Sequence, residues 1–160
     1  MKNNYKLFED LPKNKYHSCI LSTYSFDFHF FDNQLRRQLQ RAGISNIIVL
    51  CDAYTIKNSF GKLSFGTKLL QNDYVLIPIK TKGCFHPKVS LFIGDDDLCM
   101  HLGSGNLTMG GFGKNHELFT TFSCNSKTDP QYPIILHGIN YLYSFIKEHE
   151  GQIATQFSWI

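Results

Sequence analysis

Short apolar stretches alternate with amphipathic ones along most of the chain. Runs rich in branched and aromatic residues, bounded by turn residues, predict strands over 17–26, 46–53, 74–80, 87–94, 98–104 and 117–124. Apolar side chains at helical spacing predict helices over 32–43, which Gly43 closes, and over roughly 131–149. The first strand, helix and second strand make a β-α-β unit. The whole pattern indicates a layered α/β domain with a mixed sheet.

Composition narrows the class of protein. The 160 residues contain no repeat or linker, so we expect one domain over 1–160, with the alternative open that it is one part of a longer protein. No apolar run reaches the roughly 18 residues of a membrane helix, and the polar N-terminus lacks a secretion signal, which favours a cytoplasmic protein. A net charge of +3 does not by itself indicate a polyanionic partner.

Five cysteines are too widely spaced for a zinc site and odd in number, which argues against a disulfide framework. We expect most of them to be buried thiols: Cys19, Cys51, Cys84, Cys99 and Cys124.

The most informative chemistry starts at the strand predicted over 87–94. His86 and Lys88 stand two residues apart at its entrance and therefore share a face, and Pro87 is tolerated because it begins the strand. A histidine followed two residues later by a lysine arises easily by chance, so this pair needs support from other residues.

That support follows the next strand. Ser104 and Asn106 again stand two apart, and Gly105 between them is one of several glycines that would let a backbone approach a ligand closely. We expect Thr108 to lie at the start of a short helical turn whose N–H groups favour an anion, and Glu117 to lie close enough to orient a histidine.

Together these groups fit phosphoryl transfer: a histidine to attack, a lysine and an amide to hold anionic oxygens, and a carboxylate to fix the imidazole. Each has a plainer interpretation alone. The Gly-Ser-Gly-Asn stretch is also typical of a turn, Glu117 of a solvated strand end and His86 of a surface position. The ordered combination favours the functional interpretation.

This order of residues resembles the signature of the phospholipase D superfamily, especially its bacterial nuclease branch. The matching positions are His86 and Lys88, then Gly103, Ser104, Gly105, Asn106, Leu107 and Thr108, then Gly110 or Gly111, Asn115 and Glu117. Residues 23–53 resemble, more loosely, the opening β-α-β of phospholipase D-like domains in bacterial restriction, defence and DNA-processing proteins. The resemblance implies a phospholipase D-like layered sandwich, with a mixed, mostly parallel sheet flanked by helices.

The resemblance also implies roles. His86 would be nucleophile or acid in a reaction that passes through a phosphohistidine and needs no metal or cofactor. Lys88 and Asn106 would bind the nonbridging phosphate oxygens, with support from Ser104, and Glu117 would hydrogen-bond the ring of His86.

Two departures from the family pattern matter. The Asp that many members carry a few residues after the lysine is missing, and Asp95, Asp96 and Asp97 sit in the following turn, where a solvated loop is favoured over a metal site. This casts more doubt on lipase than on nuclease chemistry.

The second departure concerns the number of motifs. Of the seven histidines only His86 has a lysine two residues on, and the chemistry needs two such motifs. We therefore expect a homodimer with one composite active site. His101 and His116 could line the same cleft, but a structural role is favoured for both.

The substrate class is less well specified. Lysines interleaved with phenylalanines over 55–68 suit phosphate contact and base stacking, although a plain loop or amphipathic segment explains them equally well; Lys80, Lys82 and Lys114 would extend a basic rim. No amphipathic membrane-surface helix is present. We expect a DNA endonuclease, with target recognition in an additional recognition or helicase domain or subunit. The alternatives are a non-catalytic nucleic-acid-binding or dimerisation module and a phospholipid phosphodiesterase.

Overall fold

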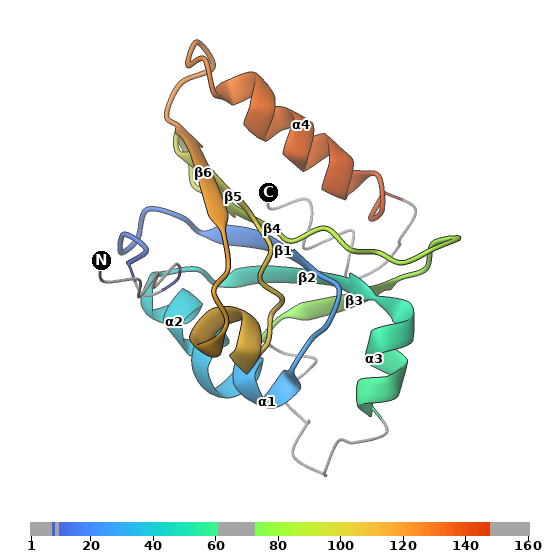
Figure 1. Cartoon of the computed structure of the whole chain (residues 1–160). Coiled ribbons are helices and arrows are strands. Elements are labelled where there is room, and N and C mark those ends of the chain that lie inside the picture. The colour runs from blue at the N-terminus through green and yellow to red at the C-terminus, as the bar shows by residue number, and fades with distance from the viewer. Residues whose placement is uncertain (1–7, 9, 61–72, 148–160) are drawn as a thin grey trace.

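A six-stranded sheet forms the centre of the molecule (Figure 1). The computed structural model describes residues 8, 10–60 and 73–147. The strands lie in the order β3-β2-β1-β4-β5-β6. Their bounds are Ser18–Thr23 (β1), Asn46–Asp52 (β2), Val75–Ile79 (β3), Val89–Ile93 (β4), Leu98–Gly103 (β5) and Phe119–Cys124 (β6). All six predicted strands are present, each slightly shorter than its apolar run.

The sheet is mixed. β1 pairs with β2 and β2 with β3 in parallel, whereas β1–β4, β4–β5 and β5–β6 are antiparallel. Two of the five pairings are thus parallel, both in the half containing β1, β2 and β3. The short turn between β4 and β5 can join only antiparallel neighbours. The layered α/β architecture expected from the sequence is confirmed. Since β1 and β4 run in opposite directions, the end of β1 lies beside the start of β4.

Three consecutive helical segments cover one face of the sheet: α1 (Phe28–Phe30), the π-helical η1 (Phe31–Leu35) and α2 (Arg36–Arg41). They start four residues before the predicted helix because the side chain of Asp27 accepts a hydrogen bond from the N–H of Phe30 (3.0 Å) and caps the first turn. Gly43, with φ of +95°, follows their end as predicted. Their apolar side chains, Phe31, Leu35 and Leu39 among them, are buried with Leu21 and Phe92 of the sheet.

The longest helix of the described residues, α4 (Tyr132–Tyr143), lies against the other face (Figure 1). Ile135 and Leu142 are fully buried there, in a cluster that includes Ile20 of β1 and Met100 of β5. The predicted helix extended to 149; residues 148 and 149 lie outside the described residues. Within the described ranges, none of the helices has the length and apolar character needed to cross a membrane.

Helix α3 (Ala53–Phe60) follows β2 directly, where the sequence left a choice between loop and amphipathic segment. Asp52 begins it by accepting the N–H groups of Tyr54 (3.0 Å) and Thr55 (3.2 Å). Of the basic and aromatic residues expected here, Lys62, Phe65 and Lys68 and the side chain of Phe60 lie outside the described residues.

All five cysteines are thiols, and four of them are buried as expected: Cys19, Cys51, Cys99 and Cys124. Cys84 is exposed. Burial raises the pKa of the Cys51 thiol to about 12, so this thiol is neutral at physiological pH and serves packing.

Candidate active site

His86 and Lys88 lie at the entrance to β4, beside the end of β1. The Lys88 ammonium lies 2.8 Å from Nδ1 and 3.1 Å from Nε2 of the His86 ring, and it also donates to the His86 carbonyl at 3.0 Å. An ammonium group can only donate, and only one nitrogen of a neutral imidazole carries a lone pair, so at most one of these two ring contacts is a hydrogen bond. A lone pair is what an imidazole needs in order to attack phosphorus.

Lys88 is half-buried, and loss of hydration lowers its pKa below the ordinary value, while the negative charge of Glu117 opposes that shift. Glu117 is thus close enough to act on the lysine electrostatically. The Lys88 carbonyl accepts a hydrogen bond from Gly103 N (3.0 Å), which places the end of β5 beside the histidine-lysine pair.

Asn106 is held by the loop that follows β1. Its Oδ1 accepts hydrogen bonds from the backbone N–H groups of Tyr24 and Ser25, both at 3.2 Å, and from the Thr23 hydroxyl at 3.3 Å. Backbone amides can only donate, so the atom that they meet is the oxygen, and the NH₂ group points away from them. The amide therefore presents a fixed donor at the end of the sheet.

The Glu117 carboxylate is occupied by neighbours other than the expected histidine. One oxygen accepts a short hydrogen bond from the Ser104 hydroxyl, and the other accepts one from Nδ2 of Asn115 (3.2 Å). Ser104 Oγ in turn accepts the N–H of Leu118 at 3.1 Å. The predicted hydrogen bond from Glu117 to the His86 ring is therefore replaced: the carboxylate braces the loop between β5 and β6, and its charge reaches Lys88.

The glycines of this loop are required by its own packing. A Cβ at Gly111 would lie 2.6 Å from the backbone N of Asn106, and one at Gly105 would lie 2.8 Å from the Gly111 carbonyl oxygen. A Cβ at Gly103 would overlap the Phe119 ring. The sequence suggested that glycines here admit a ligand; at these positions the atoms that approach closely are the protein's own.

Thr108 lies just before a π-helical turn, η3 (Gly110–Lys114), so the predicted helical turn is present. Its hydroxyl accepts the Gly111 N–H (3.1 Å) and its carbonyl accepts the Phe112 N–H (3.1 Å). Two of the N–H groups expected to attract an anion are thus already paired within the turn. The Lys114 side chain lies outside what the structure describes.

Asp52 is a site-supporting residue that sequence reasoning missed. Its Oδ1 caps α3, and its Oδ2 accepts the N–H of Phe85 at 2.9 Å, one residue before His86. A buried carboxylate with three N–H donors is a rigid anchor for the segment that carries the histidine. The only sequence signal was an acidic residue just before a helix start, the usual position of an N-cap.

Two of the other candidates, His101 and Asp97, have partners outside this cluster. His101 is buried on β5 and bonded to the Thr121 hydroxyl (2.7 Å), and burial lowers its pKa to about 4, so it is neutral at physiological pH. His116 is exposed. Asp97 pairs with Lys15 (2.9 Å) in the turn between β4 and β5, at the end of the sheet opposite His86.

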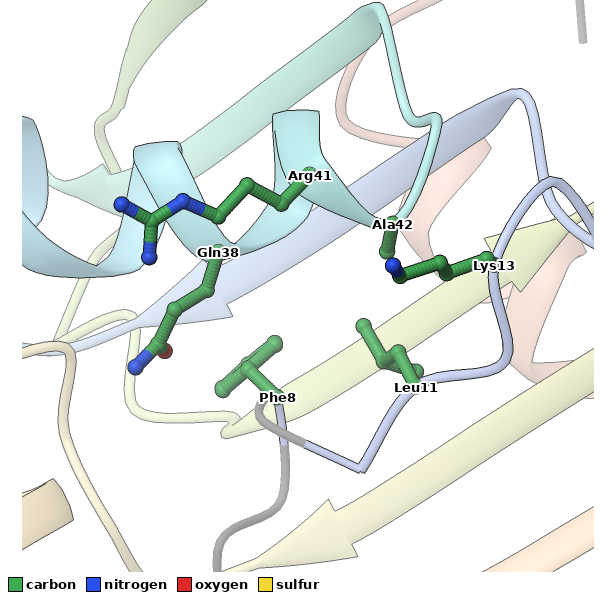
Figure 2. A pocket seen from close by; sticks show the side chains of 6 residues that line it. All are labelled: Phe8, Leu11, Lys13, Gln38, Arg41 and Ala42. Atoms are coloured by element: carbon green, nitrogen blue, oxygen red, sulfur yellow. The ribbon is translucent and has the colours of Figure 1, made fainter.

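A pocket of about 300 Å³ also lies away from the candidate site (Figure 2). It is formed by the N-terminal segment and the end of α2, and its lining residues are Phe8, Leu11, Lys13, Gln38, Arg41 and Ala42. None of the predicted site residues contributes to it. Because α2 ends just before β2 begins, the pocket lies near the start of the parallel strands, whereas His86 lies beside the end of β1.

No protein-family model matches the chain, and no curated protein matches its sequence. Solved structures do match. A phospholipase D family member, Nuc from Salmonella typhimurium, gives a TM-score of 0.62 at 15% identity over 90% of this chain and 87% of its own. NucT from Helicobacter pylori gives 0.54 at 19% identity over 88% and 82%.

A mutant of yeast tyrosyl-DNA phosphodiesterase gives a TM-score of 0.59 at 18% identity. The match covers 96% of this chain but 36% of the yeast protein, so the chain spans about a third of that protein's length. At these identities the similarity establishes the architecture: the chain has the fold of phospholipase D superfamily members.

Proposed function

We propose that the protein is a metal-independent phosphodiesterase, a nuclease that hydrolyses DNA through a phosphohistidine on His86. The observation that carries this proposal is the Lys88 ammonium against the ring nitrogens of His86, at the end of the sheet where an amide donor is anchored. The names of the similar structures, a phospholipase D family member called Nuc and a tyrosyl-DNA phosphodiesterase, support phosphodiester chemistry on nucleic acid.

In the first step a nonbridging phosphate oxygen replaces the His86 nitrogen as the hydrogen-bond acceptor of the Lys88 ammonium. The lone pair of that nitrogen is then free to attack phosphorus. A P–N bond forms, the P–O bond to the leaving group breaks, and the leaving oxygen takes a proton from a second imidazole. Water then attacks phosphorus, gives its proton to that second imidazole and breaks the P–N bond, which restores both histidines. Lys88 and the NH₂ group of Asn106 stabilise the negative charge in both steps.

The other predicted site residues support this centre. Ser104 and Glu117 fix the loop that carries Asn106, and Glu117 keeps a negative charge near Lys88. Gly105 and Thr108 shape the same loop. Lys114 would supply a further positive charge at its rim. We assign this chain to the restriction and defence group of such proteins, with target choice made by another domain or subunit.

We propose that a partner chain supplies the second imidazole. Within residues 10–60 and 73–147 the contacts of the His86 ring are Lys88 and Tyr24, and no second histidine touches it. We therefore propose a two-fold homodimer in which each His86 faces its own copy. Sedimentation equilibrium at micromolar concentration should give a dimer. A fully active monomer at that concentration would overturn this part of the proposal.

The function is tested by incubating the purified chain with labelled single- and double-stranded DNA in excess EDTA. We expect cleavage, because the charge on phosphorus is met by Lys88 and Asn106 in place of a metal ion. Dispersed phospholipid is assayed in parallel. Binding of DNA with no cleavage, unchanged across the histidine pH range, would indicate a non-catalytic module, and hydrolysis of lipid alone would indicate a phospholipid phosphodiesterase.

A further inference from the structure

Tyr24 is the residue through which the histidine and the amide of the site are connected. It directly follows the last residue of β1 and belongs neither to the histidine-lysine pair nor to the loop after β5. Its ring contacts the His86 ring, with centroids 4.9 Å apart and planes inclined at 43°. Its backbone N–H donates to Oδ1 of Asn106 at 3.2 Å.

The backbone of Tyr24 is fixed from the other side as well. Its carbonyl oxygen accepts hydrogen bonds from the Thr55 hydroxyl (2.5 Å) at the start of α3 and from the Cys51 thiol (3.4 Å) at the end of β2. Both elements are themselves anchored, because Cys51 is buried and Thr55 lies in the first turn capped by Asp52. Tyr24 thus has little freedom to move, although its side chain is only half-buried.

His86, by contrast, is exposed, so little else restrains its ring. Lys88 contacts the ring nitrogens, but in the proposed reaction a phosphate oxygen competes for that ammonium. The Tyr24 contact uses no ring nitrogen and therefore persists when substrate binds. Tilted aromatic pairs at this separation are favourable, so the tyrosine can keep the imidazole in one orientation.

We propose that Tyr24 is a positioning residue that aims the His86 imidazole and the Asn106 amide at the same phosphoryl group, one through its ring and the other through its backbone N–H. This inference rests on the proposed function and adds a residue to it. A small displacement of a nucleophile costs a large factor in rate, so loss of the ring should lower kcat more than it weakens substrate binding.

The test compares Tyr24→Leu and Tyr24→Phe with the wild type in two ways. The first is the NMR signal of the His86 Cε1–H, identified by its absence from His86→Gln. We expect the ring current of Tyr24 to displace this signal, Tyr24→Phe to keep the displacement and Tyr24→Leu to remove it. Tyr54→Leu is the matched control, because Tyr54 is 72% exposed and also lies at this end of the sheet.

The second measurement is hydrolysis of DNA and of bis(p-nitrophenyl) phosphate in EDTA. Tyr24→Leu should lower kcat about 10- to 100-fold with KM within about twofold, and Tyr24→Phe should restore kcat to within about threefold. If the His86 Cε1–H chemical shift is the same in Tyr24→Leu as in the wild type, the two rings are not in contact. If that shift changes in Tyr24→Leu while kcat does not, Tyr24 has no positioning role. A wild type with normal His86 displacement but no turnover of either substrate would overturn the proposed function, and the positioning role with it.

Discussion

Replacing His86 by alanine is expected to lower kcat for phosphodiester hydrolysis by at least about 1000-fold, because the nucleophile is removed while the phosphate-binding donors stay in place. The change should leave the fold intact: His86 is exposed, and its side-chain contacts are with Lys88 and the ring of Tyr24. Initial rates on single-stranded DNA in EDTA give the loss, and thermal unfolding followed by circular dichroism gives the stability.

The matched control is His137→Ala, which removes an exposed histidine on α4, away from the site. It should keep full activity. A second readout follows the intermediate directly: wild-type protein quenched in alkali during turnover of phosphorus-labelled substrate should retain label, and His86→Ala should retain none. An alanine variant with more than a tenth of the wild-type rate would rule out His86 as nucleophile.

Replacing Asn106 by alanine is expected to reduce both stability and activity. Two backbone N–H groups, of Tyr24 and Ser25, would lose their acceptor, whereas the Thr23 hydroxyl keeps the Ser25 carbonyl at 2.7 Å. Because the site is only partly buried, we expect these unpaired N–H groups to lower the free energy of unfolding by about 2–3 kcal/mol. Loss of a fixed donor to the phosphoryl group should lower kcat about 100- to 1000-fold.

Asn106→Asp separates the two effects. Its carboxylate still accepts the hydrogen bonds from the Tyr24 and Ser25 amides, so unfolding in urea should show a stability within about 1 kcal/mol of the wild type. The NH₂ donor is gone and a negative charge faces the phosphate, so activity should fall at least as far as in Asn106→Ala. If Asn106→Asp retains a rate within about threefold of the wild type, the NH₂ group has no role in the mechanism. If Asn106→Ala is as stable as the wild type, Asn106 does not anchor the loop.

The sequence by itself determined the local elements and the chemical groups. Alternating and helical apolar periods depend on neighbours a few residues away, so all six strands and the helices predicted over 32–43 and 131–149 follow from the pattern, whereas the helical start at Phe28 does not. The two-residue spacings of His86 with Lys88 and of Ser104 with Asn106 likewise show which chemistry is available. Helix α3 was not distinguished from a loop, because it is only eight residues long and its average hydrophobicity is low.

Tertiary structure alone decided which of these groups meet. Asn106 is anchored by Ser25, 81 positions earlier, and Asp52 holds the N–H of Phe85, 33 positions later. Such contacts exist because β1 lies between β2 and β4, an order set by packing of both sheet faces and invisible in local periodicity. The same packing makes Ser104 and Asn115, and not His86, the hydrogen-bond donors to the Glu117 carboxylate. It also places the ring of Tyr24 against the ring of His86.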